Sequence, residues 1–220
     1  KNEEISLFSP HDVPGLYDAF GTDSFDELYV RYESDESVPR KSIGAQELFL
    51  DLLKERAETG RLYIMNIDHC NSHSSFTDKV EMSNLCQEIT LPTKPLQHID
   101  DPEGEIALCI LSAINVGKIR DLEDLETLCD LAVRSLDELI DFQNYPIIAA
   151  ETATKARRSL GIGYIGLAHF LAKQGFNYSD KGAWEAVHKL TEAFQYYLIS
   201  ATVDLAEEKG ACEYSNRTKY

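Results

Sequence analysis

An apolar stretch near the middle of the chain decides the fold class: residues 106–116 read IALCILSAINV. A nearly continuous apolar run of this length, rather than an alternating one, is typical of a strand buried on both faces, as in parallel sheets. Downstream of it, apolar residues recur at intervals of three and four from Leu122 to Leu139, which predicts an amphipathic helix. A strand followed by a helix indicates an α/β architecture with mainly parallel pairing.

Further helices are predicted on both sides of this centre. Residues 182–209 carry apolar side chains at helical spacing and are followed by Gly210. Residues 42–59 form a similar pattern, with Gly60 where a C-terminal glycine cap belongs. Residues 12–33 predict short helices.

The remaining segments predict little regular structure. Residues 62–65 (LYIM) predict a short buried strand. Residues 66–101 are rich in Asn, Ser, His, Thr and Pro and favour loop and extended chain. Because no repeat or linker interrupts the chain, we expect one domain over residues 1–220 without an internal boundary.

Composition excludes several classes of function. The 220 residues include 38 acidic and 21 basic side chains, a formal net charge of −17, which disfavours a broad nucleic-acid footprint or an anionic membrane partner. No apolar run approaches the ~18 residues of a membrane span, and the first residues are too polar for a signal peptide. The start at Lys1 suggests a piece of a longer protein. An odd number of scattered cysteines favours the reducing cytoplasm; these are Cys70, Cys86, Cys109, Cys129 and Cys212.

The glycine-rich run GIGYIG, residues 161–166, formally matches a dinucleotide-binding fingerprint. That mechanism needs an apolar strand before the first glycine, but residues 153–159 are polar and helix-like. The glycines instead fall inside a predicted strand, residues 160–165, which leads into a helix through Phe170. We therefore interpret the run as close strand–helix packing rather than a nucleotide loop.

A second cluster, DHCNSH at residues 68–73, contains side chains that bind metals. A structural zinc site usually needs two close pairs of ligands, and no second pair lies at conventional spacing. A catalytic site with three protein ligands stays open as an alternative. The favoured interpretation is a polar turn whose side chains satisfy buried backbone groups.

The third candidate is the segment NLCQE. In an extended strand, alternation would place Asn84, Cys86 and Glu88 on one face and Leu85 and Gln87 on the other. An amide, a thiol and a carboxylate would then converge. The carboxylate disfavours a thiolate, so the arrangement suits a thiol that reacts in its neutral form. An edge strand with three incidental polar residues is the alternative.

These residues and several other blocks closely resemble the large, catalytic subunit of class I ribonucleotide reductase, the aerobic family that makes deoxyribonucleotides. The resemblance covers essentially all 220 residues, and several blocks in the right order are more specific than any single motif. The blocks are LFSPHDVPGL at 7–16, DHCN at 68–71, SNLC at 83–86 with Glu88, PTKPL at 92–96 and GEIALC at 104–109.

The resemblance implies a fold and a set of site residues. The fold is a ten-stranded α/β barrel of two five-stranded halves, with residues 1–220 as its central part and a finger loop at about 71–90. Cys86 would carry the thiyl radical that removes the ribose 3′ hydrogen. Glu88 would take the 3′-hydroxyl proton and Asn84 would hold the hydroxyls. The substrate-binding residues of the finger loop are Asn84, Leu85, Cys86, Gln87 and Glu88.

Cys109 matches one of two cysteines that reduce the 2′ position and become a disulfide; the alternative is a small core residue. Cys70, Cys129 and Cys212 are expected to be structural. The resemblance implies that the second reducing cysteine, the phosphate loop and the tyrosines of the radical relay would lie outside this chain. Within it, we expect no metal and no bound cofactor.

The resemblance also implies partners. A metal-containing small subunit would supply the radical, thioredoxin or glutaredoxin would reduce the disulfide, and the substrate would be a ribonucleoside diphosphate. ATP and deoxynucleotide effectors would bind outside this segment. The complete subunit is expected to be a cytoplasmic homodimer without DNA or membrane partners.

Two alternative functions remain at this stage. One is a glycyl-radical enzyme, since such barrels also carry a finger-loop cysteine. The other is a non-catalytic half of a split or truncated subunit, which would supply surfaces that complete a barrel.

Overall fold

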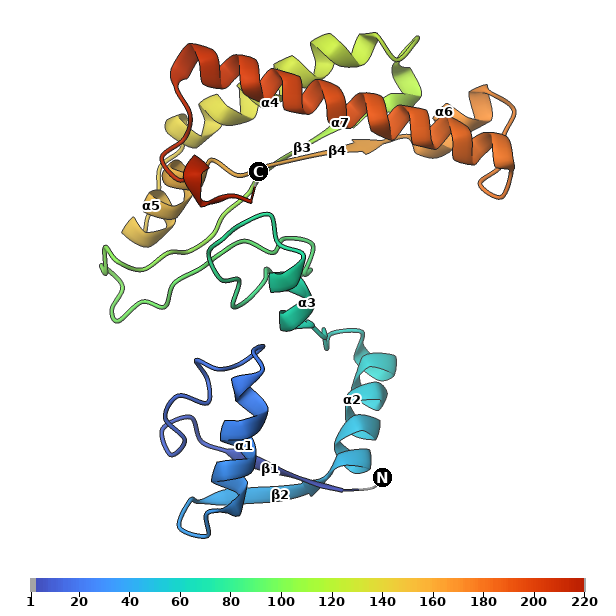
Figure 1. The fold of residues 1–220 in the computed structure, drawn as a ribbon. Coiled ribbons are helices and arrows are strands. Elements are labelled where there is room, and N and C mark those ends of the chain that lie inside the picture. Colours follow the sequence, from blue (N-terminus) through green and yellow to red (C-terminus); the bar gives the residue numbers. More distant parts are fainter. Residues whose placement is uncertain (1–2, 220) are drawn as a thin grey trace. The chain divides into compact units, whose positions relative to one another are not determined.

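The computed structural model describes residues 3–219, which gather into two compact units, Lys1–Leu91 and Pro92–Tyr220 (Figure 1). Each unit contains one two-stranded sheet, and the described residues form no closed barrel. The ten-stranded barrel and the single undivided domain therefore stay predictions.

In the first unit, β1 (Glu4–Phe8) pairs antiparallel with β2 (Arg40–Gly44), and α1 (Ser24–Ser34) lies between them in the sequence. The side chain of Tyr29 ties the helix to β1, because its hydroxyl accepts from the Ser6 amide at 2.7 Å and donates to the Ser6 carbonyl at 3.0 Å. The predicted helical region at 12–33 is helical only in its second half. The small core here consists of Val13, Leu16 and Tyr32.

The helix α2 (Ala45–Thr59) ends as its sequence predicts. Gly60 adopts the left-handed conformation, with φ of 66°, and its amide donates to the Arg56 carbonyl. The strand expected at residues 62–65 is wrong: these residues have no regular structure, and Tyr63 and Ile64 are about half exposed. An apolar run becomes a strand only when another strand takes its backbone hydrogen bonds.

A short helix, α3 (Ile67–Ser72), interrupts the region predicted as loop. From there to the end of the unit, residues 73–91 form turns and irregular chain, as expected. Residues 83–89 are thus held by side-chain hydrogen bonds rather than by a strand ladder.

The second unit is built on a parallel pair, β3 (Ile110–Asn115) and β4 (Leu160–Ile165), which confirms the predicted parallel pairing. The long helices α4 (Asp124–Phe142) and α7 (Lys181–Lys209) run along one side of this pair (Figure 1), and both match their predicted periodicity. The core forms between the helices and the strands; its buried residues are Ile114, Val116, Ile119, Leu125, Cys129, Leu190 and Phe194.

The strand β3 differs from its prediction in length and burial. It begins at Ile110 rather than at residue 106, and its burial alternates: Ile114 is 8% exposed, whereas Leu111 is 61% exposed. The expectation of burial on both faces is therefore wrong for the described residues. Helices cover one face of the pair only, and an apolar residue on the other face has no second layer to pack against.

The glycine run behaves as its flanking sequence predicts. Its first two glycines lie in β4, and Gly166 precedes α6 (Leu167–Lys173) with φ of 79°. A Cβ atom at Gly166 would lie 2.5 Å from Asn115 Oδ1 and 3.1 Å from the Gly117 amide nitrogen. The glycine therefore lets the β4–α6 turn approach the end of β3, where the 3-10 turn η1 (Val116–Lys118) begins.

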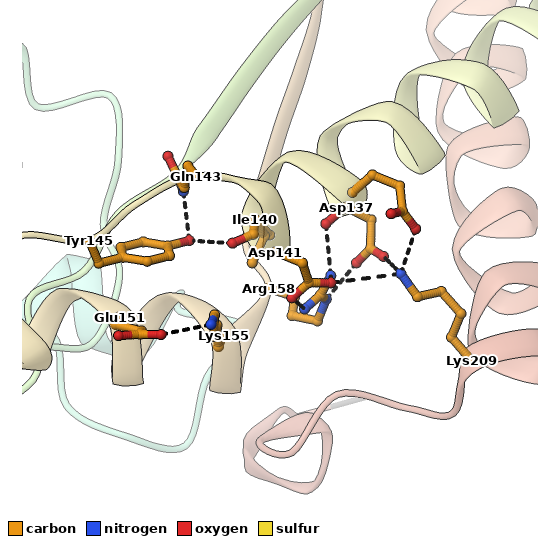
Figure 2. Close-up of polar contacts among 10 residues, drawn as sticks. Asp137, Ile140, Asp141, Gln143, Tyr145, Glu151, Lys155, Arg158 and Lys209 are labelled. Atoms are coloured by element: carbon orange, nitrogen blue, oxygen red, sulfur yellow. Dashed lines mark hydrogen bonds and ion pairs between the residues drawn. The ribbon is translucent and has the colours of Figure 1, made fainter.

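A cluster of ion pairs fixes the start of β4. We call it the clamp; its residues are Asp137, Asp141, Arg158 and Lys209. The helix α5 (Ile148–Arg157) is followed by Arg158 in the left-handed conformation, which a non-glycine residue adopts rarely. Figure 2 shows the Arg158 guanidinium between two carboxylates of α4: its Nε lies 2.5 Å from Asp137 Oδ1 and its Nη2 lies 2.8 Å from Asp141 Oδ2. Lys209, at the end of α7, reaches Asp137 Oδ2 at 2.6 Å. The clamp joins α4, the end of α5 and the end of α7.

This clamp predicts a loss of stability in acid. Burial raises the pKa of Asp137, but the hydrogen bonds and positive charges of Arg158 and Lys209 have the larger combined effect and lower this pKa overall. The hydrogen bond from Arg158 likewise lowers the pKa of Asp141. Groups with lowered folded-state pKa values stabilise the fold above their unfolded value and lose that contribution as the pH falls. The free energy of unfolding, measured by urea denaturation, should therefore decline below about pH 4.

The variant Asp137→Asn should flatten that decline, because the most buried carboxylate of the clamp no longer titrates. Asp204→Asn, which changes an exposed carboxylate on α7, is the matched control and should leave the slope as it is in the parent chain. Equal slopes for Asp137→Asn and the parent would show that the clamp does not govern acid stability.

Candidate active site

The segment that carries Asn84, Cys86 and Glu88 is a tight turn rather than an extended strand. The Gln87 amide donates to the Asn84 carbonyl at 3.1 Å, and Gln87 has φ of 61°. The expectation that alternation aligns the three polar side chains on one strand face is therefore wrong. Alternation requires extended residues throughout, and the turn breaks it after Asn84.

Side-chain hydrogen bonds close this turn. Ser83 Oγ donates to the Ile89 carbonyl, and the Ile89 amide donates to Asn84 Oδ1 at 3.1 Å. The two ends of the turn are thereby held together by the side chains of Ser83 and Asn84, and local bonds of this kind compete with strand geometry. Gln87 occupies a backbone conformation that costs a non-glycine residue free energy, a feature often found at functional sites.

The turn presents its chemistry outward. Cys86 is a free cysteine and is exposed, as are Asn84, Glu88 and the neighbouring Leu85, whose side chain is 82% exposed. An amide, a thiol and a carboxylate thus meet in one five-residue turn. The thiol is therefore accessible rather than enclosed in packed hydrocarbon.

The cluster at residues 68–73 supports the loop that leads to this turn. Asn71 Nδ2 donates to the carbonyls of Ile67 and Val80, and its Oδ1 accepts from the Val80 amide at 2.8 Å. Val80 is fully buried, so Asn71 satisfies backbone groups that water does not reach. This confirms the interpretation of that side chain as structural, although it lies on a helix rather than in a turn. Across residues 3–219, no three His, Cys, Asp or Glu side chains are placed to hold a metal ion.

Cys109 belongs to the second unit and immediately precedes β3. It is partly buried, and its Sγ donates weakly to the Ile110 carbonyl at 3.8 Å. The backbone amide of Ile110 bonds to Ser159, just before β4, which holds this part of the chain beside β4. Because it is partly exposed, Cys109 is not a fully enclosed core residue.

A buried ion pair, which the sequence did not predict, holds the segment from Glu105 to Cys109 in place. Glu105 Oε2 lies 2.7 Å from Arg157 Nη2, and both side chains are almost fully buried. Lys94 exchanges two backbone hydrogen bonds with Glu105 and places its Nζ 3.3 Å from Glu105 Oε1. A Cβ atom at Gly104 would lie 2.6 Å from Leu96 Cγ, so the PTKPL and GEIALC blocks pack directly together.

The remaining cysteines lie away from both segments in the sequence. Cys129 is fully buried in the core of the second unit, and burial raises its pKa to about 11, as for an unreactive thiol. Cys212 Sγ lies 3.6 Å from the Arg157 carbonyl.

Within the described part of the chain, no helix has both the length and the apolar character to cross a bilayer.

Comparison with known proteins agrees along the whole chain. A family model described as the barrel domain of ribonucleotide reductase matches residues 1–220. The ribonucleoside-diphosphate reductase subunit alpha of Haemophilus influenzae is 58% identical over 225 residues, which cover 100% of this chain and 30% of that protein. Subunit alpha of the Escherichia coli ribonucleoside-diphosphate reductase 1 is 54% identical with the same coverage, and the subunit alpha of phage T4 is 40% identical over 100% of this chain and 29% of its own length. The chain therefore spans about 30% of the length of these relatives.

Proposed function

This chain belongs to the ribonucleotide reductase family, and from that premise we propose that it is the central segment of the α subunit of a ribonucleoside-diphosphate reductase. The complete protein would reduce ribonucleoside diphosphates to deoxyribonucleotides. The observation that carries the proposal is the free, exposed thiol of Cys86 in the Asn84–Glu88 turn, within a chain that matches the family over its full length. A ten-stranded barrel with residues 71–90 as its finger loop is part of the same proposal.

The turn would perform the radical step. Cys86 would lose its hydrogen atom, and the resulting thiyl radical would take the hydrogen from the ribose 3′ carbon and return one at the end of the reaction. Glu88 would accept the 3′-hydroxyl proton as a general base. Asn84 Oδ1 already accepts the Ile89 amide, so the amide nitrogen of Asn84 would donate to a substrate hydroxyl.

Cys109 would supply one half of the reducing equivalents. Two thiols, Cys109 and a cysteine outside this chain, would form a disulfide while the 2′-hydroxyl leaves as water and the 2′ carbon gains hydrogen. The two electrons and two hydrogens given up by the thiols balance that reduction. Thioredoxin or glutaredoxin would then restore the thiols, and a metal-containing small subunit would supply the initial radical.

Other parts of the function lie outside this segment. The phosphate site, the sites for ATP and deoxynucleotide effectors, and the contacts of a homodimer would come from the rest of the subunit. A cytoplasmic location would suit a protein with an odd number of scattered cysteines.

A second candidate function is that of a non-catalytic part of a split subunit, which would need other segments for catalysis. Activity restored by co-expression of the flanking segments would identify a complementing part. A glycyl-radical enzyme is less well supported, because the relatives are named ribonucleoside-diphosphate reductases.

The redox role of Cys109 predicts its oxidation in a single turnover. A full-length α subunit that contains this chain, reduced and then given substrate and small subunit without external reductant, should contain Cys109 in a disulfide. Peptide mapping by mass spectrometry after alkylation measures this. The buried Cys129 is the internal control and should stay a thiol. A free Cys109 thiol after product has formed would reject the assignment.

A further inference from the structure

The Cys109 thiol lies against a residue that has no side chain. Gly161 pairs with Leu111 in the parallel register of β3 and β4. A Cβ atom at Gly161 would lie 2.9 Å from Cys109 Sγ and 2.5 Å from Leu111 Cδ2. Non-bonded heavy atoms prefer separations of roughly 3.5–4.0 Å, so a methyl group there would displace the sulfur.

The contact lies on the face of β3 and β4 away from the helices. Ile114 of β3 is in the core with α4 and α7, and Ile162 and Tyr164 of β4 pack against that core. Alternation places Leu111 and Gly161 on the opposite face. That second face, the open face, carries Leu111, Ala113, Asn115, Gly161, Gly163 and Ile165, with Cys109 two residues before Leu111.

We propose that Gly161 is a positioning residue for the Cys109 thiol: its missing side chain leaves the space that the sulfur occupies on the open face. The inference rests on the proposed redox role of Cys109. Disulfide formation requires a narrow range of distances and torsion angles between the two cysteines. A sulfur displaced by a side chain at position 161 meets those limits less often, although its own chemistry is unchanged.

The structure also indicates that a side chain here acts on position rather than on folding. The two atoms that an added Cβ would crowd, Cys109 Sγ and Leu111 Cδ2, are ends of side chains that can rotate, and Leu111 is 61% exposed. The backbone oxygen of Ile110 would lie 3.8 Å away, at an ordinary contact distance. Gly161→Ala should therefore fold. The same strand supplies a matched control, because a Cβ atom at Gly163 would meet nothing within 4 Å among the described residues.

The test uses a full-length α subunit that contains this chain, with Gly161→Ala, Gly163→Ala and the parent compared. In a single turnover without external reductant, Gly161→Ala should form the Cys109 disulfide about tenfold more slowly, since small displacements of reacting groups have effects of this order or larger. Gly163→Ala should match the parent. Alkylation of native Cys109 by iodoacetamide should change in rate in Gly161→Ala only, while the rate at Cys86 stays the same.

A double variant separates the two contacts. Gly161→Ala with Leu111→Ala removes the leucine contact but keeps the sulfur contact, so disulfide formation should stay slow. Recovery of the parent rate would overturn the proposal, because the leucine would then carry the effect. Parent-like disulfide formation and alkylation in Gly161→Ala would overturn it too. The alkylation rate needs no turnover, so it tests the position of the sulfur even if Cys109→Ser retains activity and the redox role itself fails.

Discussion

Cys86→Ser in a full-length α subunit that contains this chain should reduce deoxyribonucleotide formation on the order of a thousandfold or more, as loss of an essential reacting group commonly does. The serine O–H bond is much stronger than the cysteine S–H bond, so the hydroxyl does not yield its hydrogen atom to form the radical. The assay is single-turnover product formation with small subunit, substrate and thiol reductant present.

The same variant should stay folded. Cys86 is exposed at a turn whose closing hydrogen bonds come from Ser83, Asn84 and the backbone. Exposed substitutions of this kind usually change the free energy of unfolding by less than about 0.5 kcal/mol. A thermal melt that coincides with that of the parent would show that lost activity reflects lost chemistry.

Cys70→Ser is the control for the chemical change itself. Cys70 lies in α3 of the same unit, is a free thiol, and has no role in the proposed reaction. Its serine variant should keep most of the activity. Substantial product from Cys86→Ser, or an equal loss in Cys70→Ser, would contradict the radical role of Cys86.

Helical periodicity predicted the elements that depend on local pattern. The amphipathic spacing located α4 and α7, and a glycine at position 60 located the end of α2. The polar sequence before Gly161 correctly placed the glycine run inside a strand that leads into a helix. The helix hydrogen bonds and the Gly60 cap come from neighbouring residues in the chain, whereas the strand β4 also needs β3 as its partner.

Features that depend on distant partners were predicted less well. Residues 62–65 are apolar enough for a strand but have no strand beside them, and Leu111 is exposed although it lies in an apolar run. The Asn84–Glu88 turn failed as a predicted strand because Ser83 and Asn84 bond to Ile89, which a period-two pattern does not register. The spacing itself singled out Asn84, Cys86 and Glu88 as candidates, whereas their chemical roles came from the resemblance to the family.

The Glu105–Arg157 pair joins residues 52 positions apart, so no local pattern could identify it. The local sequence indicated the pair only through the Glu105 carboxylate, which directly precedes the apolar run 106–116. Arg157 is also held by the aromatic ring of Tyr214, 5.0 Å from the guanidinium carbon, and the Tyr214 amide donates to the Ala156 carbonyl. These contacts hold Arg157 in place, and through its ion pair with Glu105 they stabilise the segment from Glu105 to Cys109.

The burial of that pair predicts a large loss of stability in Arg157→Met. The substitution keeps much of the side-chain volume but removes one ion-pair partner of the Glu105 carboxylate, which stays almost fully buried. Among the described residues, Lys94 is then its remaining ion-pair partner. Removing one partner of a buried pair typically costs about 3–5 kcal/mol. The measurement is the free energy of unfolding of the chain in urea.

Two comparisons show whether burial is the cause. Arg134→Met also removes an arginine with two carboxylate partners, Asp130 and Glu208, but that arginine is one-third exposed, so the cost should be at most about 1 kcal/mol. The double variant Arg157→Met with Glu105→Met should recover much of the loss, because it also removes the buried Glu105 carboxylate and Lys94 can turn to solvent. Losses that simply add in the double variant would show that the two side chains contribute independently.

In Arg157→Met, alkylation of Cys109 should also become faster, because the segment between Glu105 and Cys109 then opens more often without unfolding the whole unit.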